Sequence, residues 1–227
     1  MAEPAARDVP GEVPVNAFAT VPDSAPRDCP VKGHIGVVLT PIEGMALLNL
    51  RTAPGTSALR DALQARTGLL LPDTALATAS DPHGRARALW IGPGDWLIRC
   101  TAPDRAEVEA ALSAALSGTR GALVDVGHGW TALNLQGRHA ADVLAAGCGL
   151  DLDPQVFGAG QCAMTGFGKL RVVIERRADP PRSPGAAPAG QSYDVYVARS
   201  FAGSLQHLLV EAAGEYGYRI AAPARLD

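Results

Sequence analysis

The stretch LVDVGHGWTALNLQGRHAADVLAAGCGLDLDPQVF, residues 123–157, decides the fold. An apolar run leads into a glycine-rich turn, and a second alternating run follows at 131–135. An amphipathic pattern at 139–146 stops at Gly147, and Pro154 closes an acidic loop. This order predicts a strand, a tight turn, a strand, a helix and a loop.

Two kinds of periodicity alternate along the rest of the chain. Runs with a period of two residues predict strands at 46–51, 87–91, 95–100, 122–126, 131–135, 170–175, 193–198 and 218–221. Runs with a period of 3.6 residues predict helices at 57–66, at 103–117, at 139–146 and after Ser200. Thr101 and Asp104 form a capping-box signal ahead of the second helix.

The order of these elements predicts an α+β protein. Each half reads β-α-β-β-α-β, the split βαβ or ferredoxin-like unit, over about 33–127 and 128–222. No sequence repeat relates the halves, and only the order of elements recurs. We expect the two units to pack closely, with 122–126 and 131–135 linking them through one sheet edge.

Two segments interrupt the globular pattern. Residues 1–32 are Pro-rich and short of apolar residues, so we expect a flexible arm ahead of one domain at 33–227. The segment 178–192 is rich in Pro, Gly and Ala between two strand patterns, which predicts an exposed hairpin loop.

Composition excludes several classes of function. The chain has 227 residues, of which 47% are hydrophobic and 19% charged, with a formal net charge of −3. Such a charge offers no basic field for a nucleic acid backbone. We expect no membrane span, because no apolar run approaches the ~20 residues that one needs. The start of the chain has no signal-peptide pattern and the four cysteines are scattered, so we expect reduced thiols and a cytoplasmic location.

Two G-x-G sequences raise the question of a dinucleotide site. A phosphate-binding fingerprint needs a strand, the glycine loop and then a helix. The sequence 92–94 instead joins two predicted strands, and no helix pattern follows 158–160. Both are therefore predicted turns, and the flanking Trp90 and Trp96 are expected to make a cross-strand or core contact.

Asp125 and His128 could form an acid–base pair if the turn brought them together. We favour a structural role, in which Asp125 accepts backbone N–H groups across the turn. Gly127 and Gly129 would then supply positive φ angles.

Other chemistries find less support. Cys148 or Cys162 could pair with His128 or His139 as a nucleophile, but we expect Cys148 to be a small buried side chain. The histidines lack zinc spacing, and the acidic run 151–153 lacks the glycine and glutamate of a calcium loop. The sequence therefore predicts no catalytic, cofactor-binding or metal-binding residue in this chain.

The segment 193–201 has apolar residues on both faces of its strand. Such a strand is either central in its sheet or covered by another subunit, so this segment is a candidate interface. Arg199, just before the following helix, is a candidate exposed contact.

Three blocks, 123–157, 89–98 and 193–201, carry a family resemblance over about residues 35–220. In their residues, their spacing and their order, these blocks resemble the gamma subunit of heterotetrameric sarcosine oxidase. The resemblance implies a fold similar to the folate-binding region of aminomethyltransferases. It also implies a non-catalytic structural subunit, partnered by alpha, beta and delta subunits that carry FAD, FMN, NAD, zinc and tetrahydrofolate.

Three alternative functions stay open at this point. One is a gamma-like subunit of N-methylglutamate dehydrogenase or of another N-methylamine oxidoreductase. The second is a stand-alone, folate-binding protein of the aminomethyltransferase type. The third is a simple binding module with no link to an oxidoreductase.

Overall fold

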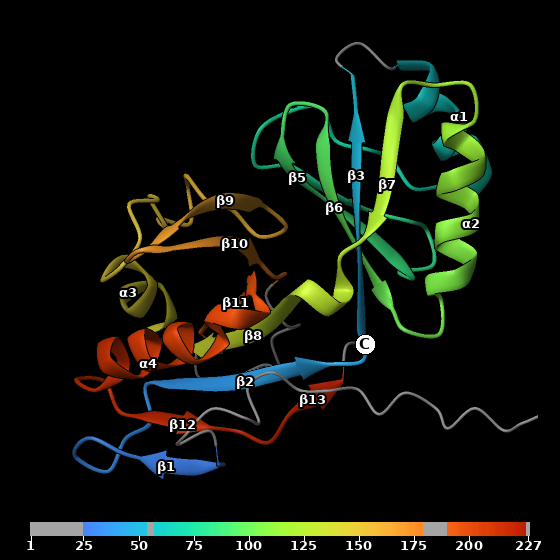
Figure 1. Cartoon of the computed structure of the whole chain (residues 1–227). Coiled ribbons are helices and arrows are strands. Elements are labelled where there is room, and N and C mark those ends of the chain that lie inside the picture. The colour runs from blue at the N-terminus through green and yellow to red at the C-terminus, as the bar shows by residue number, and fades with distance from the viewer. Residues whose placement is uncertain (1–24, 54–56, 179–189, 226–227) are drawn as a thin grey trace, which may run out of the picture.

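The computed structural model describes residues 25–53, 57–178 and 190–225, which form two β-sheets with helices on their outer faces (Figure 1). The strands of the larger, eight-stranded sheet are, in spatial order, β1 (Arg27–Cys29), β12 (Tyr218–Ile220), β2 (Val37–Glu43), β8 (Trp130–Gly137), β11 (Gln191–Ala198), β10 (Leu170–Arg176) and β9 (Cys162–Phe167), with β13 (Ala224–Arg225) also paired to β2. The strands of the five-stranded sheet are β4 (Thr78–Ser80), β5 (Ala86–Gly92), β6 (Asp95–Thr101), β3 (Met45–Thr52) and β7 (Gly121–Asp125).

Helices α1 (Ser57–Thr67) and α2 (Arg105–Leu116) pack on the five-stranded sheet. Helices α3 (Ala140–Ala145) and α4 (Ala202–Ala213) pack on the eight-stranded sheet, at the opposite side of the molecule in Figure 1. Two short 3₁₀ turns, η1 (Gly127–Gly129) and η2 (Arg199–Phe201), follow β7 and β11. Among the described residues, no helix is long and apolar enough to cross a membrane.

The five-stranded sheet confirms the predicted split βαβ unit. Its elements run β3-α1-β5-β6-α2-β7 along the chain, with β4 as an added edge strand before β5. In space the four main strands take the order β5-β6-β3-β7, the ferredoxin-like arrangement. Alternate residues of these strands, such as Leu48 and Ile98, point to α1 and α2 and form one buried core.

The eight-stranded sheet contains the second unit and takes strands from the start of the chain. The elements β8, α3, β10, β11, α4 and β12 follow the predicted order, with β9 as an added edge strand before β10. However, β2 lies between β12 and β8, and β1 lies beyond β12. The first predicted unit, 33–127, therefore begins in the structure at β3. The sequence pattern did not predict β2, because this segment contains Pro41 and proline lacks the N–H that a central strand needs. The structure accommodates it between the β12 and β13 pairings, which end at Leu39 and begin at Ile42.

The structure describes part of the predicted N-terminal arm and part of the predicted hairpin loop. Residues 1–24 of the predicted arm lie outside the described residues, but Arg27–Cys29 forms β1, because it pairs with β12. Residues 179–189 of the predicted loop also lie outside the described residues. Gln191 and Ser192, which the sequence placed in that loop, instead extend β11 along β8.

The two sheets pack face to face and form a four-layer α/β/β/α arrangement. A third buried cluster lies between them: Leu47, Leu89, Leu97, Ala132, Cys162, Val173 and Tyr196. The expectation that 122–126 and 131–135 share a sheet edge is wrong. Strand β7 belongs to one sheet and β8 to the other, because η1 redirects the chain between them.

Helix starts differ in detail from the sequence signals. Asp104 is the N-cap of α2, and its backbone N–H donates to Thr101 Oγ1 at 3.4 Å, while the Thr101 hydroxyl contacts Asp104 Oδ2 at 2.7 Å. The two side chains thus pair with each other rather than forming a full capping box. Ser200 lies within η2 and does not cap α4, whose N-cap is Phe201.

Candidate functional site

Both G-x-G sequences are turns, as predicted. Residues 92–94 form the β5–β6 hairpin, where Trp90 and Trp96 are directly paired across the strands. Gly94 has φ +69°, and a Cβ there would lie 2.5 Å from the Thr52 carbonyl oxygen. The hairpin tip therefore lies against the end of β3 and leaves no room for a phosphate. Gly160 sits before β9, and its N–H donates to the Arg176 carbonyl at 2.8 Å.

Asp125 has the structural role that we favoured. Its Oδ1 accepts the Gly127 N–H at 2.8 Å, and its Oδ2 lies 2.7 Å from Arg105 Nη2 of helix α2. Both carboxylate oxygens are thus engaged by groups other than His128. The expected positive φ angles at Gly127 and Gly129 are wrong, because these residues form the 3₁₀ turn η1.

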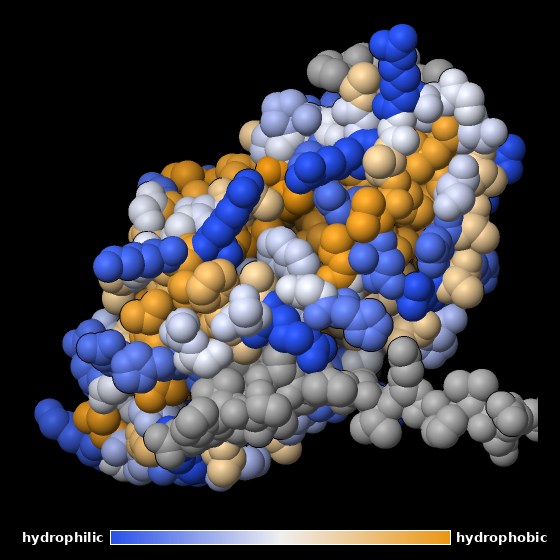
Figure 2. Space-filling view, viewed as in Figure 1, coloured by the Kyte–Doolittle hydropathy of each residue, from blue (hydrophilic) through white to orange (hydrophobic). Residues whose placement is uncertain are grey.

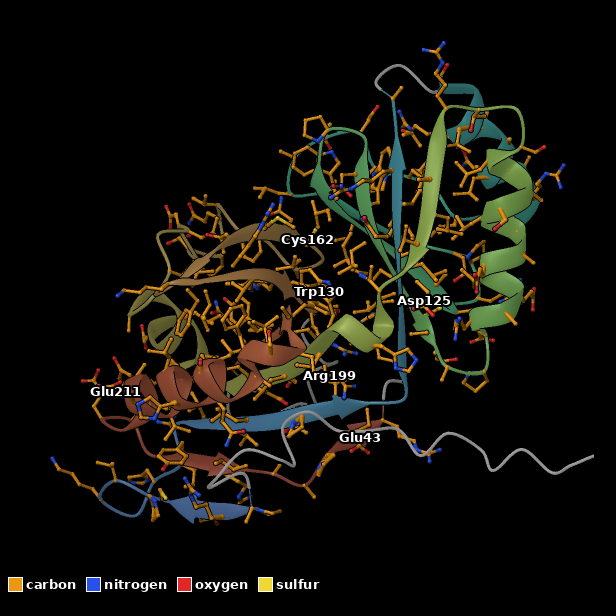
Figure 3. All side chains as sticks on the ribbon, viewed as in Figure 1. Glu43, Asp125, Trp130, Cys162, Arg199 and Glu211 are labelled. Atoms are coloured by element: carbon orange, nitrogen blue, oxygen red, sulfur yellow. The ribbon has the colours of Figure 1, made fainter. Side chains whose placement is uncertain are left out.

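The two candidate cysteines, Cys148 and Cys162, sit in apolar cores. Cys148 packs in the core under α3 and α4, and Cys162 lies between the two sheets (Figure 3). Burial raises the pKa of the Cys162 thiol to about 12 and that of Cys100 to about 11. A nucleophilic cysteine needs a lowered pKa, so these environments work against thiolate formation. His139 instead stacks on Tyr216, with ring centroids 4.4 Å apart.

The acidic run 151–153 folds into turns. Asp151 Oδ1 accepts the Asp153 N–H at 3.0 Å, and Asp153 Oδ1 accepts the Gln155 N–H at 2.8 Å. Across the described parts of the chain, no group of three or more metal-ligating side chains comes together.

The candidate interface strand is central in its sheet. Strand β11 lies between β8 and β10, with Tyr193, Val195 and Val197 facing the helices and Tyr196 facing the other sheet. Burial within the chain explains why both faces of the strand are apolar. The alternative, that another subunit covers this strand, is wrong.

A cluster of charged side chains between the sheets escaped the sequence analysis. Arg99 of β6 reaches across the layer, and its Nη1 lies 3.0 Å from Asp194 Oδ2 of β11 and 3.6 Å from Glu175 Oε2 of β10. Arg87 of β5 pairs with the other oxygen of Glu175. The Tyr196 hydroxyl donates to Glu175 Oε2 at 2.8 Å. We call these five residues the inter-sheet cluster.

Further polar groups surround the inter-sheet cluster. Arg177 Nη1 lies 3.1 Å from Asp194 Oδ2, and Asn134 Nδ2 donates to Asp194 Oδ1 at 2.7 Å. Asp194 is fully buried, and the side chain of Glu175 is only 2% exposed. Such burial of charge is stable only where partners are complete, as they are here.

The electrostatics of the inter-sheet cluster follow from burial. Burial raises the pKa of Asp194, the charge of Glu175 adds to this, and Arg177, Arg99 and Asn134 act against it. Burial lowers the pKa of Arg99, but Tyr196, Glu175 and Asp194 outweigh it, and the net pKa is raised. Arg99 therefore stays charged and holds both carboxylates.

The two carboxylates of the inter-sheet cluster are buried, since Asp194 is fully buried and the Glu175 side chain is 2% exposed, whereas the Arg87 side chain is 22% exposed. A shallow groove of about 550 Å³ lies at the edge of the sheet junction, lined among others by Ile91, Met164, Lys169 and Arg171. No member of the cluster lines it, and neither does any carboxylate or histidine. The cluster thus joins the two sheets.

One sequence signal could have revealed the inter-sheet cluster. Arg99, Glu175 and Asp194 are each a charged residue in a mainly apolar strand. Because side chains alternate along a strand, each lies on the same face as an apolar residue two positions away. Their pairing still required knowledge that the two sheets face each other, since Arg99 and Asp194 are 95 residues apart.

Fold and site together define a protein of two ferredoxin-like units, joined by a buried ionic and apolar layer. The model of the sarcosine oxidase, gamma subunit family matches residues 51–215. The chain belongs to this family.

Individual relatives agree with the family model. The gamma subunit of sarcosine oxidase from Corynebacterium sp. (strain U-96) is 30% identical over 186 residues, which cover 82% of this chain and 83% of the relative. The gamma subunit from Arthrobacter sp. is 31% identical over 180 residues, covering 79% and 81%.

Solved structures agree as well. The heterotetrameric sarcosine oxidase from Corynebacterium sp. U-96, in complex with pyrrole 2-carboxylate, contains a chain that matches with a TM-score of 0.68 at 28% identity. The match covers 83% of this chain and 87% of that chain. The aminomethyltransferase T of the glycine cleavage system from Bartonella henselae matches with a TM-score of 0.52 at 16% identity, over 80% of this chain and 50% of that one. This second likeness confirms the expected similarity of fold.

Proposed function

We propose that this chain is the non-catalytic structural subunit of a heterotetrameric sarcosine oxidase. Family membership and the match to a chain of such an oxidase support the subunit role. The observation that carries the structural part is the inter-sheet cluster, whose two carboxylates are buried between the two sheets. The cluster holds the two sheets together, because an arginine pairs with each of its two carboxylates.

The proposal assigns the reaction to partner subunits. Alpha, beta and delta subunits would carry FAD, FMN, NAD, zinc and tetrahydrofolate, and they would demethylate sarcosine and transfer its one-carbon unit. This chain would contribute shape and contact surface. Its four cysteines are free, which supports a reducing, cytoplasmic setting.

Co-expression tests the subunit role. A tagged copy of this chain, expressed with the three other subunits from the same source, should retain them through purification. The complex should show a flavin absorbance spectrum that bleaches when sarcosine is added without oxygen. A tagged chain that retains no flavin-containing partner would refute the proposal.

A second arm tests the structural assignment. The purified chain alone should show no flavin absorbance and no sarcosine turnover, and titration calorimetry with tetrahydrofolate should give no heat of binding. Arg99→Met in the complex should lower thermal stability and leave the KM for sarcosine unchanged. Turnover by the isolated chain would show that the catalytic centre lies here.

A further inference from the structure

Strand β7 has an open side. It is the last strand of the five-stranded sheet, and within the described parts of the chain it pairs with β3 alone. The Val126 N–H donates to the Leu47 carbonyl at 3.0 Å, which fixes the phase of this antiparallel ladder. Alternation then turns the backbone groups of the even-numbered residues of β7 toward β3. The backbone groups of its odd-numbered residues point away from the sheet.

The other sheet edges are shorter or partly covered. Strands β1 and β4 have three residues each. Strand β9 is longer, but its first residue, Cys162, donates its N–H to the Leu76 carbonyl at 2.9 Å. Strand β7 has five residues with the sequence GALVD, and it contains no proline, lysine or bulge. Proteins ordinarily protect an exposed edge with such features or with charged side chains, and the one charged residue of β7 is its last, Asp125, which pairs with Arg105 of α2.

The side chains of β7 add an apolar surface to this open edge. Val124 is 53% exposed, the most exposed of the large hydrophobic side chains described. It pairs with Asn49 of β3, so it lies on the sheet face opposite to α1 and α2. Exposed Ala122 lies on the same face, and Val126 just beyond the strand packs against the inter-sheet core. Figure 2 shows apolar atoms gathered over this unit, where β3, β6 and β7 lie in Figure 1.

We propose that β7 accepts a β-strand from another subunit of the oxidase, which continues the five-stranded sheet. Unpaired backbone donors and acceptors in a row match an extended strand and no other kind of element. Alternate apolar side chains of that strand would cover Val124 and Ala122. This inference rests on the proposed function, because that function supplies a permanent partner in place of a second copy of this chain.

Two exposed valines allow a matched test. Val124→Lys places a charge at the centre of the proposed contact, whereas Val156→Lys changes an equally exposed valine, 51% exposed, in a loop outside both sheets. Each tagged variant is co-expressed with the other subunits, and the amount of retained partner per tagged chain is measured. We expect Val124→Lys to lower retention about tenfold or more, since a lysine buried at an interface finds no counter-charge. Val156→Lys should match the wild type.

A backbone variant tests strand pairing itself. Leu123→Pro removes an N–H that points outward and leaves the ladder to β3 intact, whereas Val124→Pro removes one that bonds to β3. Because the Leu123 side chain also packs on the core under α1 and α2, Leu123→Ala serves as the control for the loss of that side chain and should retain the partner. Leu123→Pro should keep the circular dichroism spectrum of the wild type and lose the partner. Val124→Pro should lose the folded spectrum.

The outcomes separate the two proposals. A wild-type chain that retains no partner overturns the subunit role, and this inference with it. A wild-type chain that retains the partner, with Val124→Lys and Leu123→Pro doing equally well, overturns only the β7 contact. The β7 contact with a partner subunit is also overturned if the isolated chain forms a discrete dimer that Val124→Lys converts to monomer.

Discussion

Asp194 shows how much a single residue depends on its neighbours. Its carboxylate is fully buried, and it is held by Arg99 of β6, by Asn134 of β8 and by Arg177, which directly follows β10. Removing one partner of a buried ion pair leaves the other charge without compensation, which costs more than the pair contributes. The inter-sheet cluster is therefore the most sensitive site to substitution at the residue scale.

Arg99→Met should lower the free energy of unfolding by about 3–5 kcal/mol, because Asp194 and Glu175 would stay buried without it. The matched control is Arg51→Met, which breaks an ion pair with Asp95 whose arginine side chain is 68% exposed. That control should cost less than about 1 kcal/mol. Urea denaturation followed by fluorescence measures both, and equal losses would contradict a special role for the buried cluster.

Thiol labelling tests the environments of the cysteines. Cys29 is half-buried, while Cys100, Cys148 and Cys162 are buried. At pH 8 iodoacetamide should modify Cys29 first, and the other three only after denaturant is added, as mass spectrometry would show.

The same thiols affect stability at high pH. Burial raises the folded-state pKa values of Cys100 and Cys162 to about 11 and about 12, above the ordinary thiol value of 9.0. Above that value the unfolded chain loses thiol protons that the folded chain keeps, so stability should fall as the pH rises from 9. Cys162→Ala should reduce the slope of that loss.

At the scale of elements, the sequence predicted the helices and strands whose apolar residues repeat with a clear period. It failed for elements that depend on pairing with a strand distant in sequence. The helices α1 and α2 and the strands β3, β5, β6 and β8 were found because their apolar residues repeat with the right period. Strands β1, β4 and β9 were missed because they are short or carry a weak pattern, and β2 because Pro41 interrupts it. The buried ion pairs could not be predicted, since no local signal records which face of one sheet meets the other.

Neighbouring leucines of α4 offer a test of its packing. Leu209 is fully buried in the core beneath the helix, whereas Leu208 is only partly buried. Leu209→Ala should lower the unfolding free energy by about 2–5 kcal/mol, because it removes buried methyl groups and leaves a cavity. Leu208→Ala, the same change one position earlier, should cost less. Thermal unfolding of the two variants checks the order, and a reversed order would contradict the placement of α4.

At the scale of the whole molecule, the apolar and ionic layer between the sheets makes the two units interdependent. We expect one cooperative transition, with tryptophan fluorescence and far-ultraviolet circular dichroism giving coincident curves in urea. Trp90 and Trp96 report on the first unit, and Trp130 on the second. Leu47→Ala, which removes a fully buried side chain from the layer, should separate the curves. Two resolved transitions in the wild type would show that the units unfold independently.

The position of β2 has a consequence for how the chain acquires its structure during synthesis. All strands of the five-stranded sheet lie in one stretch of sequence, from β3 to β7. This unit can therefore form while the ribosome is still translating the rest of the chain. Strand β2 emerges before all of them, yet its parallel neighbour β12 begins only at Tyr218. It stays unpaired on that side until Tyr218 and its neighbours have been synthesised, and contacts so distant in sequence form slowly. We expect the nascent chain to expose the free side of β2 until then, as a target for chaperones.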